Sequence, residues 1–214
     1  MSEPRPRFIF TLLRHGESVG NAESRWQGQT DFPLNDTGRA QARALAERWK
    51  SEGMTFDKIF SSPLARARET AEIISAAVGA PAELDPIWME RAVGEYSGLT
   101  SQEVHQLPQS DFHTPYDAVG GDGEGDWELF LRSGQALHSL LRQPIGKYLV
   151  VSHGGLLNQF LHAVLGIAPH ANNSGPRFRF ANTAFARMVY IPSLHRWEMD
   201  ALNDRAHWSG DDPY

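Results

Sequence analysis

The chain has 214 residues, of which 41% are hydrophobic and 21% are charged, a composition typical of a globular protein. Its length favours one domain, residues 1–214, with room for an insertion. The 26 Asp and Glu residues outnumber the 20 Lys and Arg residues, and the net charge of -6 argues against a nucleic-acid partner. Because the chain has no cysteine, disulfides, thiolate metal sites and cysteine nucleophiles are excluded.

The N-terminal region carries no pattern of an export signal. Its longest apolar run, residues 8–13, is too short for the apolar core of a signal peptide. No stretch of the sequence approaches the roughly 20 apolar residues of a membrane-spanning helix. We therefore expect a cytoplasmic protein without a membrane partner.

Short apolar runs rich in β-branched and aromatic residues alternate with amphipathic helical patterns. The first expected strand covers residues 8–13, and a helix over residues 35–51, capped by Asp36 or Thr37, follows it. The later elements are expected, in chain order, to be a strand at 56–60, a helix at 63–78 with Pro63 in its first turn, a strand at 82–89, a helix at about 127–142, a strand at 147–152, a helix at 156–165 and a closing hairpin of strands at 184–191 and 196–199. This alternation predicts an α/β fold with a mostly parallel sheet and helices on both faces.

One segment, residues 92–126, breaks this alternation. It shows little apolar periodicity and contains the glycine-rich run at residues 120–125. We interpret it as a lid-like insertion over the sheet and not as a second domain.

Polar residues follow four of the expected strands. Arg14 and His15 end the first strand, Arg66 lies in the first turn of the helix after the second, Glu90 follows the third, and His153 follows the fourth. Ligands of open α/β sheets bind at the carboxyl ends of the strands. A single residue of this kind is more often a cap or a structural hydrogen-bonding group, but four such placements at one edge favour a functional site.

These residue types suit phosphate chemistry. Planar guanidinium groups match the oxygens of a phosphate, and an unprotonated imidazole nitrogen can attack phosphorus. A carboxyl group such as that of Glu90 could give a proton to the departing alkoxide. The cationic surroundings leave the protonation of this carboxyl group open.

The motifs resemble those of the histidine phosphatase superfamily, in its phosphoglycerate-mutase-like branch. They occur in the family's order and comprise residues 14–18, residues 62–67, Glu90 with Gly94 and Gly98, and residues 152–155, with the tail from 180 to 204 also similar. The resemblance implies a three-layer α/β/α fold, a small-molecule phosphate ester as substrate, and no metal or other cofactor.

The same resemblance implies roles for individual residues. His15 would be the phosphorylated nucleophile, His153 the second histidine of the phosphate pocket and Glu90 the proton donor. Arg14 and Arg66 would bind the phosphate.

Further positions match parts of the family that contact phosphate or substrate. These are Asn21, Gln27, Gly28, Arg91 and the backbone amide of Gly154.

Two activities of this family remain open, a phosphomonoester hydrolase with a phosphohistidine intermediate and a phosphoglycerate mutase. Between Arg91 and Arg132 the chain has no Lys or Arg and carries eight acidic residues. A mutase has to hold a second anionic group, so this segment favours the hydrolase. The oligomeric state, monomer or homodimer, is left open by the sequence.

Residues 16–20 also match the Gly-x-Ser-x-Gly pattern of serine esterases, which would make Ser18 a nucleophile. Only one expected strand precedes Ser18, and the candidate oxyanion loop at 153–155 follows it instead of preceding it, so this alternative is disfavoured. A calcium loop starting at Asp122 fails because Trp127 and Ser133 stand where Gly and Glu are required.

Overall fold

The computed structural model describes residues 5–108 and 110–210. One six-stranded sheet with the order β3-β2-β4-β1-β5-β6 forms its centre. The strands are β1 (Phe8–Arg14), β2 (Lys58–Ser61), β3 (Ala82–Leu84), β4 (Lys147–Ser152), β5 (Phe185–Ile191) and β6 (Arg196–Asp204). The first four are parallel, and the closing hairpin of β5 and β6 adds antiparallel to β1. The predicted α/β fold with a mostly parallel sheet is confirmed.

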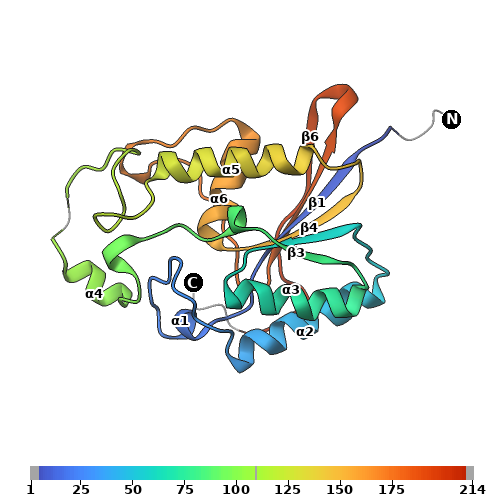
Figure 1. The fold of residues 1–214 in the computed structure, drawn as a ribbon, viewed down its shortest axis with the longest axis horizontal. Helices are drawn as coiled ribbons and strands as arrows, with labels where there is room; N and C mark the ends of the chain where they lie inside the picture. The colour runs from blue at the N-terminus through green and yellow to red at the C-terminus, as the bar shows by residue number, and fades with distance from the viewer. Residues whose placement is uncertain (1–4, 109, 211–214) are drawn as a thin grey trace.

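Helices cover both faces of the sheet (Figure 1). The α-helices of the described ranges are α1 (Val19–Ala22), α2 (Asp36–Ser51), α3 (Ala65–Val78), α4 (Ser101–Gln106), α5 (Asp126–Leu141) and α6 (Gly154–Leu165). Figure 1 shows α2 and α3 on one face and α5 and α6 on the other. None of the helices in the described ranges has the length and apolarity to span a membrane.

The two faces have separate cores because side chains alternate along each strand. In β4, Val150 belongs to the core under α5 and α6, with Phe160 and Leu140. The next residue, Val151, belongs to the core under α2 and α3, with Trp49. Burial on both faces accounts for the continuous apolar sequence of the central strands.

Several predicted boundaries are wrong: β6, for example, ends at Asp204 and not at residue 199, and three of the other errors have a local reason. The third strand ends at Leu84 and not at residue 89, because Pro86 lacks an N–H group and begins a one-turn 3-10 helix, Pro86–Trp88. The N-cap of α2 is Asn35, whose side chain accepts a hydrogen bond from the Gly38 N–H at 2.8 Å, and not Asp36 or Thr37.

The third error concerns Pro63. It lies before α3 and not in its first turn, since Leu64 is the N-cap and the helix begins at Ala65. Arg66 is nevertheless the second residue of α3, as predicted.

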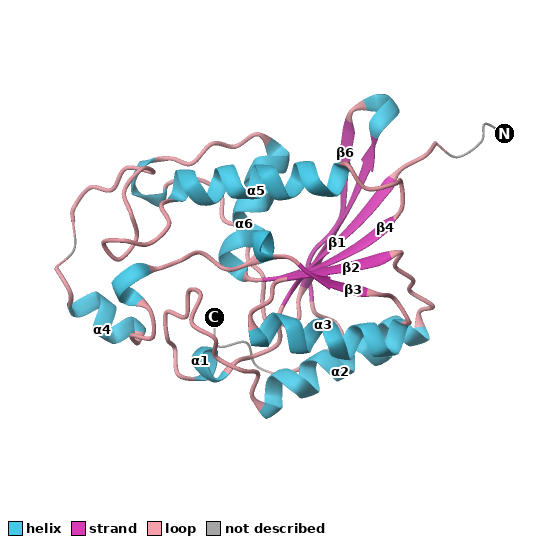
Figure 2. Cartoon of the chain, in the orientation of Figure 1, coloured by secondary structure: helices cyan, strands magenta, loops and turns pink. Residues whose placement is uncertain are grey.

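Residues 92–126 are mostly loop (Figure 2) and extend beyond the carboxyl ends of the strands. The glycine-rich run folds back onto the start of this segment, where the Glu124 N–H donates to the Ala92 carbonyl at 2.8 Å and the Glu95 N–H to the Gly120 carbonyl at 2.9 Å. Gly120 has φ of +59°, and a Cβ there would collide with the Val93 carbonyl oxygen. The glycines are therefore needed for close backbone approach.

Candidate active site

The carboxyl ends of β1, β2 and β4 meet at one edge of the sheet. Arg14 at the end of β1 pairs with Ser152 at the end of β4, and β2 pairs with the other side of β4. His15 and His153, the residues after these strand ends, have ring centroids 5.0 Å apart. The edge thus brings together the two histidines predicted to form the site.

The imidazole of His15 is buried, with 3% of the residue exposed. Its Nδ1 lies 2.6 Å from the Gly16 carbonyl oxygen. Because a carbonyl only accepts hydrogen bonds, Nδ1 carries the hydrogen and, in the neutral ring, Nε2 has a free electron pair. Burial first, and then the charges of Arg66 and Arg14, hold the pKa of His15 well below its usual value. His15 is therefore neutral at physiological pH.

His153 is fully buried and its Nε2 lies 2.8 Å from Ser62 Oγ. Its Nδ1 has no hydrogen-bond partner among the described residues. Burial, together with the charges of Arg66 and the other nearby cations, lowers the pKa of His153 well below its usual value. A neutral imidazole with an unsatisfied nitrogen is thus held next to His15.

Arg66 is 1% exposed and supplies a buried positive charge. Its Nη2 donates to the Gly28 carbonyl at 2.8 Å and its Nη1 to the Thr30 carbonyl at 2.9 Å, whereas within the described ranges its Nε has no partner. Burial lowers the pKa of Arg66 to about 10, opposed by the nearby Glu90 and Asp31 carboxylates. The guanidinium therefore stays charged at neutral pH.

Gly28 holds Arg66 through its carbonyl group. Its φ is +50°, and a Cβ would lie 2.6 Å from Val93 Cγ2, so a larger residue would displace this loop. Gly28, predicted to contact phosphate or substrate, thus holds the predicted phosphate ligand Arg66 in this structure.

Arg14 and Gly154 lie side by side. The Arg14 Nη1 donates to the Phe180 carbonyl at 2.7 Å. Gly154 begins α6, and a Cβ there would lie 3.7 Å from Arg14 Nε. The first turn of α6 therefore faces the Arg14 guanidinium, as the predicted site requires.

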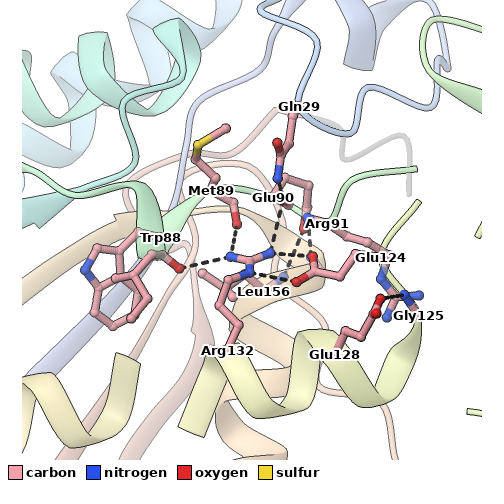
Figure 3. Close-up of polar contacts among 12 residues, drawn as sticks. Gln29, Trp88, Met89, Glu90, Arg91, Glu124, Gly125, Glu128, Arg132 and Leu156 are labelled. Carbon is pink, nitrogen blue, oxygen red and sulfur yellow. Dashed lines mark hydrogen bonds and ion pairs between the residues drawn. The ribbon is translucent and has the colours of Figure 1, made fainter. Parts of the chain in front are cut away.

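Glu90 lies at the N-terminus of α6 (Figure 3). Its Oε1 accepts from the Arg91 N–H at 2.8 Å and the Leu156 N–H at 3.0 Å, and its Oε2 accepts from the Gly155 N–H at 3.0 Å. Glu90 thus caps the helix whose N-cap residue is His153, and it joins the third strand region to the histidine site.

Three predicted substrate-side residues are engaged with other side chains. The Gln27 Oε1 and the Asn21 Oδ1 both lie within hydrogen-bond distance of Ser18 Oγ, at 2.7 and 2.9 Å. Arg91 forms an ion pair with Asp126. Arg91 is therefore neutralised in this structure.

Ser18, the nucleophile of the esterase alternative, is fully buried and is the N-cap of α1. It forms a capping box with Asn21, in which the Asn21 N–H donates to Ser18 Oγ at 3.1 Å. In the described part of the chain, its hydroxyl contacts Asn21 and Gln27 and not a histidine base. This geometry gives Ser18 a structural role.

Sequence reasoning assigned no role to Asn182 and Thr183, which hold the His15 backbone. The Asn182 Nδ2 and the Thr183 N–H donate to the His15 carbonyl at 3.0 and 3.2 Å. Thr183 has φ of +54°, which is rare for a β-branched residue and marks a strained position at a candidate site. Such long-range contacts have no local sequence signal; Asn182 could be found only through the resemblance of the tail.

No group of three or more His, Asp or Glu side chains in the described ranges is placed to hold a metal ion. The charged groups described at this edge include the guanidinium groups of Arg14 and Arg66 and the carboxyl groups of Glu90 and Asp31. The arrangement suits an anion that takes hydrogen bonds from arginine and presents an electrophilic centre to His15.

A family model of the histidine phosphatase superfamily (branch 1) matches residues 10–205. The chain belongs to this family, which confirms the predicted resemblance, and it is an enzyme of the superfamily. The probable phosphoglycerate mutase GpmB of Photorhabdus laumondii is 37% identical over 205 residues, which cover 92% of this chain and 93% of that protein.

Solved structures of similar proteins include Bacillus stearothermophilus YhfR, with a TM-score of 0.79, 26% identity, and coverage of 94% of this chain and 98% of that one. The mycobacterial glucosyl-3-phosphoglycerate phosphatase in complex with VO3 has a TM-score of 0.75 and 27% identity, with 94% and 99% covered. Relatives of this chain thus include proteins named as phosphatases and as mutases.

Proposed function

We propose that this protein is a phosphomonoester hydrolase that transfers the phosphoryl group of a small phosphate ester to His15 and then to water. The observation that carries the proposal is the contact between His15 Nδ1 and the Gly16 carbonyl at 2.6 Å. It fixes the hydrogen on Nδ1 and leaves Nε2 as the nucleophile, in a ring that burial keeps neutral.

In the first step, the His15 Nε2 electron pair forms a bond to phosphorus and the bond from phosphorus to the ester oxygen breaks. Glu90, in its protonated form, gives a proton to the departing oxygen, which leaves as an alcohol, and Glu90 becomes a carboxylate. In the second step, a water molecule gives a proton to Glu90 and attacks phosphorus, and the P–N bond breaks. Inorganic phosphate leaves, and both side chains return to their starting states.

Positive charge for the transition state comes from Arg14 and Arg66. The unsatisfied Nε of Arg66 and Nδ1 of His153 are the groups that we assign to phosphate oxygens, together with the N–H of Gly154 at the start of α6. Buried donors of this kind are costly without an acceptor, and a bound phosphate would satisfy them.

Hydrolysis is favoured over phosphoglycerate mutase activity by the charges around the lid-like segment. Residues 92–131, which include this segment, carry no Lys or Arg, and the flanking Arg91 and Arg132 are paired with Asp126 and Glu124. A second anionic group on the substrate would find these two cations already neutralised. The mutase is the second candidate because a relative at 37% identity is named a probable phosphoglycerate mutase.

We expect hydrolysis of the phosphate monoesters of uncharged alcohols to be faster than mutase turnover on 3-phosphoglycerate. Both rates should be measured with the same enzyme preparation, by phosphate release and by formation of the isomeric phosphoglycerate. Mutase turnover that exceeds hydrolysis would reverse the assignment, and Arg177 or Arg179 would then be the first candidates for the second anion.

Activity should persist after extensive dialysis against EDTA, because Arg14 and Arg66 supply the charge that a metal ion supplies in other phosphatases. Phosphate release before and after dialysis is the measurement, with a metal-dependent phosphatase treated in parallel as the control. A large loss that a divalent ion restores would show that the proposed metal-independent mechanism is wrong.

A further inference from the structure

The Asp85 N–H still donates to the Ser61 carbonyl of β2 at 2.9 Å, but residues 86–90 lead on to Glu90 without strand pairing, and side chains contribute to holding their backbone. The Ser152 Oγ donates to the Trp88 carbonyl at 2.8 Å, and the Gln29 Nε2 donates to the Glu90 carbonyl at 3.0 Å. The backbone from which the Glu90 carboxyl group extends therefore depends on these side chains, whereas residues at the ends of β1 and β4 are fixed by the sheet.

Arg132 of α5 makes the largest contribution to this support (Figure 3). Its Nη1 donates to the carbonyl oxygens of Ile87 and Met89 at 2.9 and 2.7 Å, and its Nη2 to that of Glu90 at 3.3 Å. Its Nε and Nη2 also donate to the Glu124 carboxylate at 2.8 and 2.6 Å. Five bonds engage the five N–H groups of one guanidinium.

The Glu124 carboxylate balances the charge of this guanidinium, and both side chains are mostly buried. The Arg132 guanidinium donates to the backbone carbonyl of Glu90 and not to its carboxyl group. The hydrogen bonds to the Glu90 carboxyl group come from backbone N–H groups of other residues. A cation is thus held close to Glu90 without an ion pair to its carboxyl group.

We propose that Arg132, held by Glu124, is the positioning residue that fixes Glu90 for proton transfer to the leaving oxygen. The inference rests on the proposed function, in which Glu90 is the proton donor. It assigns to Arg132 no contact with substrate. Its effect is expected only where the leaving group needs a proton.

The test compares two substrates, p-nitrophenyl phosphate, whose leaving group departs without a proton, and the phosphate monoester of a simple alcohol, whose leaving group requires one. Arg132→Gln should lower kcat on the alkyl ester by about 100-fold. On the aryl ester, the same substitution should lower kcat by about tenfold or less. Arg142→Gln, the same change at an exposed position at the end of α5, should leave both rates unchanged.

A double variant separates positioning from general damage. In a Glu90→Gln background, Arg132→Gln should cause no further loss on the alkyl ester, because the group that it positions is already absent. Equal losses on both esters, or full additivity in the double variant, would overturn the inference. If Arg132→Gln does not fold, Glu124→Gln serves in its place and should give the same selective loss.

The two proposals can fail separately. Formation of a phosphoenzyme from the aryl ester tests His15 and does not depend on Arg132. If the phosphoenzyme forms normally but Arg132→Gln lowers kcat equally on both esters, only the positioning role is refuted. If activity survives His15→Ala, the proposed function is refuted.

Discussion

Replacement of His15 by Ala is expected to lower phosphate release by about 10⁴-fold or more, since it removes the atom that forms the bond to phosphorus. The effect should appear in kcat for alkyl and aryl esters alike. The side chain is almost fully buried, so circular dichroism and thermal unfolding must show that the variant is folded.

A matched histidine variant controls for this result. His105→Ala changes an exposed residue of α4 whose Nδ1 contacts the Ser101 carbonyl, and it should retain the wild-type rate. If folded His15→Ala kept a rate near that of His105→Ala, the nucleophile would have to be another group.

Replacement of Arg66 by Met should lower kcat by about 10²- to 10³-fold, the usual effect of losing a preorganised group that stabilises charge in the transition state. KM should rise as well, because the guanidinium also holds the carbonyl groups of Gly28 and Thr30. Arg66→Lys should recover little of the rate, since an ammonium group cannot donate in a fork to two carbonyls and to phosphate.

Arg68 provides the control two residues further along α3. It is exposed, with a loose ion pair to Glu72 at 3.9 Å, so Arg68→Met should change kcat by less than about twofold. Equal effects of the two substitutions would mean that Arg66 contributes only general positive charge.

Sequence patterns predicted the candidate site because its residues lie at strand ends, where local signals are strong. A strand followed by a short motif placed Arg14, His15 and His153 at one edge, and the register of β1 and β4 agrees. The N-terminal turn of α3 placed Arg66 in the same way. These placements needed only the alternation of strand and helix and the geometry of a parallel sheet.

Contacts between distant segments could not be found in this way. Ser62 contacts His153 across 91 positions, and Asn182 donates to the His15 carbonyl across 167 positions. The support of Glu90 was missed because the apolar pattern predicted a strand up to residue 89, whereas Pro86 ends the pairing and Arg132 takes over.

The charge between Arg91 and Arg132, around the lid-like segment, also differs from what a count of the acidic residues suggests. The sequence suggests eight repulsive carboxylates, but Asp126 and Glu124 form ion pairs with Arg91 and Arg132, and Glu103 caps α4. As a consequence, the charges of these two acidic residues and of the two flanking arginines neutralise each other. The proposed preference for substrates without a second anion therefore rests on the pairing of Arg91 and Arg132 more than on repulsion.

The most direct test of the central claim is rapid-quench trapping of the enzyme with a substrate labelled on its phosphoryl group. We expect label on the protein that is lost in acid and kept in base, as a phosphoramidate of histidine should be, that maps to His15 and is absent from His15→Ala. Label that resists acid, or that persists in the His15→Ala variant, would contradict the phosphohistidine mechanism.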